Sequence, residues 1–168
     1  MRALFIGRFQ PFHNGHKAVC EYIAKEADEL IIGIGSSQMS HEPRHPFTAG
    51  ERILMITRAL HDLPVPLYVL PIPDVNRNAI WVAHVKTMVP HFDVVYSSNP
   101  QVIRLFAEAG IPVKSAPMVE REVLSGTKIR ERMVAGGDWE PYVPPETAEV
   151  IRSIDGLTRL AEVGRHDE

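Results

Sequence analysis

The sequence has a single cysteine, no long apolar run and no long stretch of basic residues. Since Cys20 stands alone, no intramolecular disulfide can form, which suits a reducing compartment, and we expect a cytoplasmic location. No segment approaches the ~18 apolar residues of a membrane-spanning helix, and the amino terminus lacks a signal-like apolar core. The formal net charge of −3 argues against bulk binding to nucleic acid or to an anionic membrane.

The glycine-rich motif of dinucleotide-binding oxidoreductases is also absent. No G-x-G-x-x-G follows the first apolar strand, and Gly33-Ile34-Gly35, at the end of the second, has no third glycine in place. An NAD-dependent oxidoreductase therefore lacks support. What the chain does contain, 45% hydrophobic and 23% charged residues in a length of 168, is typical of one soluble globular domain.

Apolar runs and helical spacings alternate along the chain. Strands are expected at Ala3–Phe9, Leu30–Gly35, Leu67–Ile72, Val94–Ser97 and Pro112–Ala116. Helices are expected at His16–Ala27, Thr48–Leu60, Asn78–Met88, Asn99–Gly110, Ser125–Ala135 and Pro145–Ile154, followed by a short tail. This alternation predicts one α/β domain, residues 1–168, with a Rossmann-like, doubly wound sheet of five parallel strands. The last helices, from about residue 138, would form a C-terminal extension.

Several helix ends have local signals. Thr48-Ala49-Gly50-Glu51 is a capping box, in which the first side chain and the fourth bond each other's backbone N–H groups. Asn99-Pro100 supplies a capping side chain and a proline at the first helical position, and Gly110 is expected to end that helix.

The most informative segment joins the first strand to the first helix. Gly7 and Arg8 lie at the end of the strand, and His13 and His16 flank Gly15. In an open α/β sheet, ligands bind at the carboxyl edge of the strands, and helix N-termini there favour phosphate. Two ordinary loop histidines, or half of a metal site, are the alternatives. The strand, the glycine and the following helix together favour a phosphate site.

A second phosphate candidate begins at Ser125. Ser125 and Thr127 are residue types common at helix starts, so taken alone they favour an ordinary N-cap. However, Lys128 and Arg130 in the same first turns oppose the helix dipole. Cations at that position make more sense if an anion lies between them and the free N–H groups.

Polar residues after the third strand form a candidate acceptor site. Asp74 precedes Asn78 and Trp81, and the latter two lie on one helix face. A helix cap and a core tryptophan are the alternative interpretations. A tryptophan face beside an amide and a carboxylate also suits a flat, cationic carboxamide ring.

The loop after the second strand is proline-rich. His41 and His45 are four residues apart, but the prolines between and after them argue against a metal site on one helix face, so an active-site loop is favoured. Arg52, early in the following helix, has two interpretations: a phosphate ligand or the partner in a structural ion pair.

These segments together resemble a known superfamily. His13-Asn14-Gly15-His16 matches the histidine-any-glycine-histidine signature of the nucleotidyltransferases. Ser125–Arg130 resembles their second signature, which is rich in serine and threonine and ends in arginine. The residues around Asp74 and Trp81, and the loop stretch 46–52, are similar to the archaeal-type nicotinamide-nucleotide adenylyltransferases.

The resemblance, which covers about residues 3–155, implies adenylyl transfer from ATP to nicotinamide mononucleotide, giving NAD and pyrophosphate. It implies four catalytic residues: His13, His16, Arg44 and Arg130. The implied ATP-binding residues are Gly7, Arg8, Phe9, His13, Gly15, His16, Ser125, Thr127 and Arg130. The implied acceptor-binding residues are Asp74, Asn78 and Trp81.

The resemblance also implies a divalent cation, Mg²⁺ above all, bound mainly through the phosphates. It implies a homo-oligomer, since archaeal members are commonly hexamers. Two alternatives stay open: the same chemistry on flavin mononucleotide, phosphopantetheine or nicotinic acid mononucleotide, and a non-catalytic nucleotide sensor. Asn78 and Trp81 disfavour the flavin and pantetheine acceptors weakly, and the presence of both histidines and Arg130 argues against a sensor.

Overall fold

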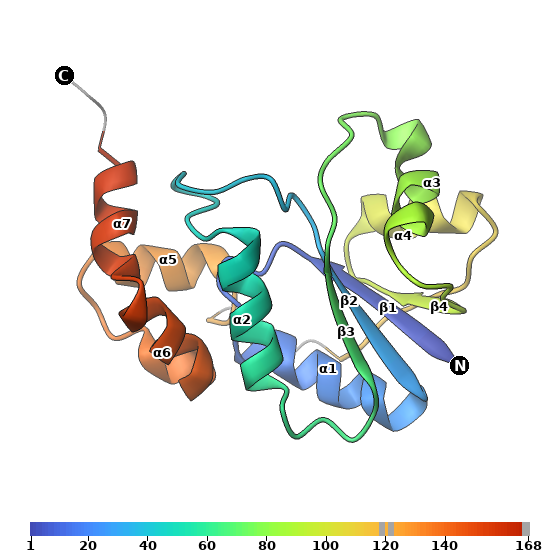
Figure 1. The fold of residues 1–168 in the computed structure, drawn as a ribbon, viewed down its shortest axis with the longest axis horizontal. Coiled ribbons are helices and arrows are strands. Elements are labelled where there is room, and N and C mark those ends of the chain that lie inside the picture. The colour runs from blue at the N-terminus through green and yellow to red at the C-terminus, as the bar shows by residue number, and fades with distance from the viewer. Residues whose placement is uncertain (118–119, 121–122, 166–168) are drawn as a thin grey trace.

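The computed structural model describes residues 1–117, 120 and 123–165. In this part of the chain the strands form one sheet of five, ordered β3-β2-β1-β4-β5, in which every neighbouring pair is parallel (Figure 1). The strands are β1 (Arg2–Gly7), β2 (Glu29–Ile34), β3 (Leu67–Pro71), β4 (Val94–Tyr96) and β5 (Val113–Lys114). The predicted Rossmann-like, doubly wound parallel sheet is confirmed.

Helices cover both faces of this sheet (Figure 1). They are α1 (Asn14–Glu26), α2 (Ala49–Ala59), α3 (Asn78–Met88), α4 (Pro100–Glu108), α5 (Gly126–Val134), α6 (Pro145–Ser153) and α7 (Gly156–Val163), with a 3-10 turn η1 (Glu140–Tyr142). Helices α3 and α4 pack together on one face, and α1 and α2 cover the other. Helix α6 packs against α2, and α7 contacts both α5 and α6.

The strands separate two hydrophobic cores. Ala3, Leu30 and Ile32 face the core built with α1 and α2, whereas Leu4 and Ile31 face the core built with α3 and α4. Successive side chains of a strand point to opposite faces, so each strand contributes to both cores. This explains why the strands are apolar runs rather than alternating sequences.

The topology places a crevice at the centre of the sheet. The chain leaves β1 through α1 and enters β2 on one side of β1, while β4 pairs with the other side. The carboxyl ends of β1 and β4 therefore flank the point where the strand order reverses. Doubly wound sheets bind their ligands at such a point.

The sequence predicts a short tail after residue 154, and this prediction is wrong. Residues Gly156–Val163 form a further helix, α7. Asp155, between α6 and α7, has φ 53 and turns the chain from one helix into the next. Gly156 follows in a tight contact: a Cβ there would lie 2.9 Å from Ile151 Cγ2 and 3.2 Å from Phe47 Cε1. The aspartate and glycine therefore turn the chain from the end of α6 into a further helix, not into a tail.

The predicted strands are too long at their carboxyl ends. The first stops at Gly7, because Phe9 has φ 53 and turns away from the sheet. The predicted strand Pro112–Ala116 contains only two paired residues, because β5 is an edge strand whose sole neighbour, β4, is short.

None of the helices in the described ranges combines the length and apolar character needed to cross a membrane.

Candidate active site

His13 and His16 form a reciprocal cap at the start of α1. His13 Nδ1 accepts hydrogen bonds from the backbone N–H groups of Gly15 and His16, at 3.1 and 3.3 Å. His16 Nδ1 accepts from the backbone N–H of His13 at 3.1 Å. This is a capping box made of two imidazoles. The two histidines therefore hold the helix start together, in addition to any role toward a ligand.

The capping bonds determine where the ring protons lie. Because both Nδ1 atoms accept hydrogen bonds, each neutral ring carries its proton on Nε2. Burial lowers the pKa of His13 to about 4. Burial, and then the neighbouring His13, lower the pKa of His16 well below its usual value. Near neutral pH the ligand-free site thus offers two uncharged imidazoles whose Nε2–H groups are not used by the cap.

Close packing fixes these rings. The centroids of His13 and His16 are 3.6 Å apart with the rings nearly parallel, and Phe9 meets His16 edge-on at 4.8 Å. Glycines make room for this arrangement: a Cβ at Gly15 would lie 2.9 Å from His13 Cε1, and one at Gly7 would lie 2.9 Å from Phe9 Cζ. The predicted residues Gly7, Phe9 and Gly15 are thus brought together with the histidines.

The N-terminus of α5 is tied to the loop between β1 and α1. Ser125 Oγ accepts from the backbone N–H of Lys128 at 3.1 Å, so Ser125 is indeed the helix cap. Arg130 Nη1 donates to the Gln10 carbonyl at 2.6 Å, and its Nη2 lies 3.4 Å from Thr127 Oγ1. No acidic residue offsets the cations in this first turn. The start of α5 is therefore a cationic helix N-terminus directed toward the loop.

Three arginines from separate segments line one cavity of about 370 Å³, which we call the arginine cavity. Arg8 follows β1, Arg44 lies in the loop before α2, and Arg130 belongs to α5; His16 and Thr127 line the cavity with them. None of the three makes an ion pair with a described residue. Burial, and then Arg8 and Arg44, lower the pKa of Arg130. The guanidinium groups repel one another, and an anion between them would relieve that repulsion.

A second cavity of about 310 Å³, the central cavity, lies at the carboxyl ends of β1 and β4. His13, His16 and Gly7 line it from the β1 side, with Ser97 after β4 and Ser125 at the start of α5. His16 lines the arginine cavity as well, so the two cavities adjoin at this ring.

Asp74, Asn78 and Trp81 line a third cavity of about 330 Å³, which we call the acceptor cavity after the role that the sequence predicts for these residues. It shares Arg8 with the arginine cavity. Trp81 is half-buried and packs edge-on against Phe106, with ring centroids 5.4 Å apart. The core and the ligand interpretations of Trp81 are therefore compatible, since one ring both packs on α4 and faces the cavity.

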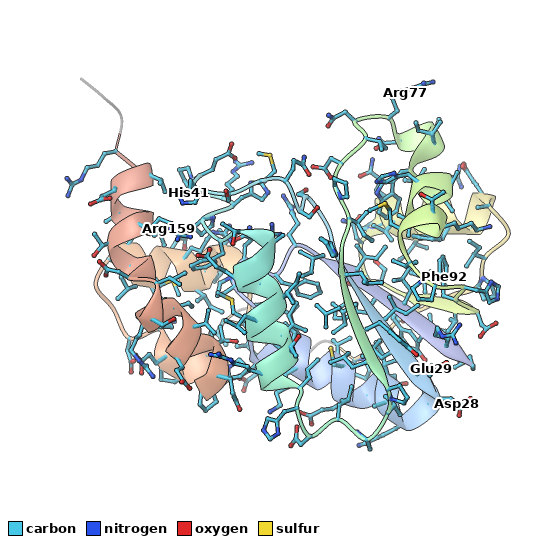
Figure 2. All side chains as sticks on the ribbon, in the orientation of Figure 1. Asp28, Glu29, His41, Arg77, Phe92 and Arg159 are labelled. Atoms are coloured by element: carbon cyan, nitrogen blue, oxygen red, sulfur yellow. The ribbon has the colours of Figure 1, made fainter. Side chains whose placement is uncertain are left out.

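Asp74 is already engaged by a loop that the sequence did not connect with it. Its carboxylate accepts hydrogen bonds from Ser36 Oγ at 3.2 Å and from Gln38 Nε2 at 3.0 Å. Gln38 Oε1 in turn accepts from the backbone N–H of Asp74 at 3.0 Å. Arg77, also at this cavity, extends from the outer end of the loop before α3 (Figure 2).

Two residues near the site have roles that sequence reasoning missed. Arg52 is fully buried and donates only to backbone carbonyls, so it is neither a phosphate ligand nor an ion-pair partner. His45 Nε2 lies 3.3 Å from Arg8 Nη1. Burial, and then Arg8, lower the pKa of His45. Since arginine only donates, His45 accepts this contact through Nε2. No sequence signal identifies either partnership.

The site residues are rich in cations and poor in metal ligands. In the described part of the chain, no group of three or more His, Cys, Asp or Glu side chains is arranged to hold a metal ion.

Comparisons with known proteins agree on the class of this protein. The sequence matches the cytidylyltransferase-like family over residues 4–132, a stretch that contains both histidines and Ser125–Arg130. The chain therefore belongs to this family of nucleotidyltransferases.

Relatives give the finer assignment. The chain is 62% identical over 166 residues to the nicotinamide-nucleotide adenylyltransferase of Methanocorpusculum labreanum, covering 99% of each sequence. It is 60% identical over 167 residues to the enzyme of the same name from Methanospirillum hungatei, covering 99% of this chain and 96% of that one. Within the larger family, the chain is a member of the nicotinamide-nucleotide adenylyltransferases.

A solved structure supports the fold. A bifunctional NMN adenylyltransferase/ADP ribose pyrophosphatase from Francisella tularensis, complexed with AMP and manganese, superimposes with a TM-score of 0.77 at 20% identity. The match covers 96% of this chain and 52% of that one, so this chain spans about half of that protein's length.

Proposed function

We propose that this chain transfers the adenylyl group of ATP to nicotinamide mononucleotide, giving NAD and pyrophosphate, at the three adjoining cavities. The observation that carries the proposal is the arginine cavity: Arg8, Arg44 and Arg130 converge without a carboxylate among the described residues. A polyphosphate supplies the negative charge that this cavity lacks. The relatives are also named for this reaction.

In the proposed arrangement the triphosphate lies across the two helix N-termini. The adenosine occupies the central cavity, the β- and γ-phosphates lie in the arginine cavity, and the α-phosphate lies beside His16, where the two cavities adjoin. Ser125 and Thr127 bring the backbone N–H groups of α5 to the phosphates. Arg8 stands at the boundary with the acceptor cavity and can contact both substrates.

The chemistry needs no protein nucleophile. A 5′-phosphate oxygen of the acceptor attacks the α-phosphorus of ATP, the bond to the bridging oxygen breaks, and pyrophosphate leaves with that oxygen. The protein positions the two substrates and stabilises the charge on the phosphoryl oxygens. The Nε2–H groups of His13 and His16, held by caps at Nδ1, are preorganised donors for this purpose. The arginines hold the leaving pyrophosphate.

A divalent cation fits this site only in company with phosphate. The cavities present arginines and imidazoles, which attract phosphate oxygens and repel a bare cation. Mg²⁺ usually keeps several waters and binds through substrate phosphates, where it neutralises charge between them. The Francisella tularensis structure was obtained with AMP and manganese, which supports a divalent cation here. We assign no protein ligand to it.

Trp81 and Asn78 favour the nicotinamide nucleotide among the alternative acceptors. The half-buried indole offers a face of the right size for one six-membered cationic ring. The amide of Asn78 can exchange hydrogen bonds with a carboxamide. The arginine cavity and the paired imidazoles favour an enzyme over a non-catalytic nucleotide sensor.

The direct test is product analysis. The protein is incubated with ATP, Mg²⁺ and each of four acceptors, namely nicotinamide mononucleotide, nicotinic acid mononucleotide, flavin mononucleotide and phosphopantetheine, and the products are identified by mass. We expect NAD and pyrophosphate with the first. A flavin or coenzyme A precursor without NAD would contradict the proposal.

Two variants of His16 separate its capping from its catalytic role. In His16→Asn, the side-chain oxygen replaces Nδ1 and keeps the cap, but no donor remains at the position of Nε2. We expect kcat to fall by roughly a hundredfold with little change in the KM for ATP. His16→Gln keeps a donor near Nε2 but loses the cap. If His16→Asn keeps kcat while His16→Gln loses it, His16 acts only as the helix cap and the catalytic assignment fails.

A further inference from the structure

Arg52 is a fully buried cation at the centre of the site's scaffold. It lies in the first turn of α2, where its Nε donates to the Thr48 carbonyl at 3.2 Å. Its Nη1 donates to the carbonyls of Arg8 and Gly35 at 2.9 and 3.1 Å. Its Nη2 lies 3.2–3.3 Å from three further carbonyls, those of Ser36, Ser37 and Met39. One side chain therefore joins the chain after β1, the loop after β2 and the start of α2.

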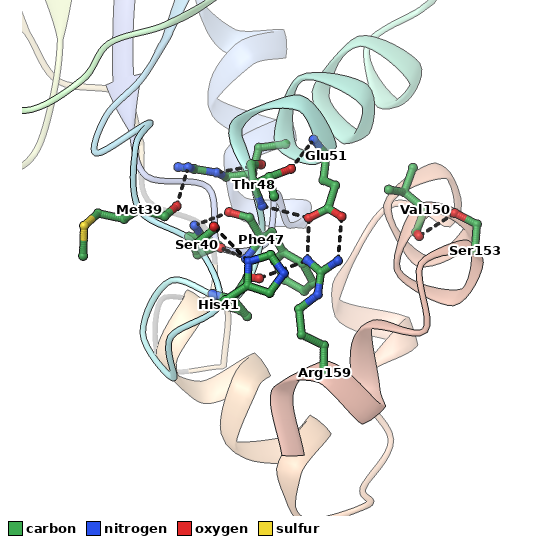
Figure 3. A network of polar contacts seen from close by, with 12 residues as sticks. Met39, Ser40, His41, Phe47, Thr48, Glu51, Val150, Ser153 and Arg159 are labelled. Atoms are coloured by element: carbon green, nitrogen blue, oxygen red, sulfur yellow. Dashed lines mark hydrogen bonds and ion pairs between the residues drawn. The ribbon is translucent and has the colours of Figure 1, made fainter. Parts of the chain in front are cut away.

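The charge of Arg52 is not neutralised by the neighbouring acid. Glu51 instead forms a two-bond ion pair with Arg159 of α7, at 2.6 and 2.9 Å (Figure 3). Burial lowers the pKa of Arg52 to about 10, so the guanidinium stays charged near neutral pH. A buried charge satisfied only by carbonyls is costly to retain, which indicates a role other than a surface ion pair. Its planar fork can hold several backbone segments in one orientation.

The loop that Arg52 holds reaches the acceptor cavity. The carbonyls of Ser36, Ser37 and Met39 accept from Arg52. The side chains of Ser36 and Gln38 in the same loop donate to the Asp74 carboxylate. Gln38 bonds both the carboxylate and the backbone N–H of Asp74. In the other direction, Arg52 holds the carbonyl of Arg8, whose side chain lines the arginine cavity.

We propose that Arg52 is a positioning residue that sets the acceptor cavity and the arginine cavity in register with each other. It acts on Arg8 directly through the carbonyl, and on Asp74 through the loop Ser36–Met39. In-line transfer needs the acceptor phosphate and the α-phosphorus aligned, and a small displacement of one cavity relative to the other is enough to lose that alignment. The inference rests on the proposed function, because it concerns the binding of both substrates.

The test compares Arg52→Lys, Gln38→Ala and the double variant, with KM for each substrate, kcat and melting temperature measured on the folded enzyme. Arg52→Lys keeps the charge but loses the fork, so we expect kcat to fall and KM for both substrates to rise, each by about tenfold, as for one or two lost hydrogen bonds. Gln38→Ala should raise KM for nicotinamide mononucleotide alone. The double variant should raise it no further than Arg52→Lys does, because both changes break one connection.

Arg2→Lys is the matched control. Arg2 is a half-buried arginine that bonds Glu29 and the His91 carbonyl, and it lies at the opposite end of the strands, where Figure 2 labels Glu29. Arg2→Lys should lower the melting temperature without changing the KM for either substrate. The proposal is overturned if Arg52→Lys lowers the melting temperature without changing either KM. It is also overturned if the effects of Arg52→Lys and Gln38→Ala on the KM for nicotinamide mononucleotide multiply in the double variant.

If Arg52→Lys does not fold, Gln38→Ala decides alone. An unchanged KM for nicotinamide mononucleotide in that variant overturns the proposed connection to Asp74. A raised KM for nicotinamide mononucleotide, with an unchanged KM for ATP, supports that connection. Failure of the proposed function is recognised separately, because the unmodified protein would then make no NAD.

Discussion

Replacing His13 with asparagine should make the protein less sensitive to acid. The asparagine side-chain oxygen can take the place of Nδ1 as the cap acceptor for Gly15 and His16, but it does not titrate. In the native protein, burial moves the pKa of His13 from an ordinary value of 6.5 to about 4. As the pH falls, the unfolded state therefore binds this proton first, and the free energy of unfolding decreases.

The size of the effect follows from the two pKa values. Linkage gives a loss of about 2 kcal/mol from this one group between about pH 7 and about pH 4.5. His13→Asn should remove that loss while other groups titrate as before. The measurement is urea unfolding of parent and variant, without ligand, at the two pH values. His13→Gln serves as control, since it also lacks the titration but loses the cap, at a cost of about 1 kcal/mol at both pH values. An equal pH dependence in parent and His13→Asn would show that His13 is not held neutral by burial.

Three further predictions concern ligand binding. Arg130→Ala should weaken ATP binding in calorimetry, with Arg130→Lys rescuing it only in part; unchanged affinity would refute the phosphate assignment. Nicotinamide mononucleotide should quench tryptophan fluorescence through Trp81, so Trp81→Phe should abolish the quench and Trp139→Phe should keep it, whereas the reverse result would remove the acceptor assignment. Gly15→Ala should lower kcat, because its Cβ would lie 2.9 Å from the ring of His13; full activity would contradict the tight packing.

Local signals made most of the secondary structure predictable. The box formed by Thr48 and Glu51 and the Asn99 cap occur as expected, since each depends on residues a few positions apart. The strands could be found because burial on both faces makes them continuous apolar runs. Helix α7 was missed because Asp155 and Gly156 have the residue types of a helix end, and only the packing of Gly156 on α6 shows that the chain continues as a helix.

The candidate site was predictable where its residues are consecutive and not where its contacts are long-range. The histidine pair and the Ser125 segment are short motifs, and the structure brings both to one crevice. The partners of Arg52 are carbonyls, which every residue has, so its role leaves no pattern in the sequence. The engagement of Asp74 by Gln38 spans 36 residues and depends on strand order, which residue types do not specify.

Contacts at and around the arginine cavity join segments far apart in the chain. Arg130 meets the Gln10 carbonyl across 120 residues, and Arg159, which holds Glu51 and the Pro46 carbonyl, does so across 108 and 113. Such closures lose much chain entropy before their contacts offset it, so we expect them to form late in folding. A chain that has folded only its first strands and α1 has the histidine cap without the arginine cavity. We therefore expect ATP binding to appear only in the final step of folding, which makes ATP a reporter of the completed fold.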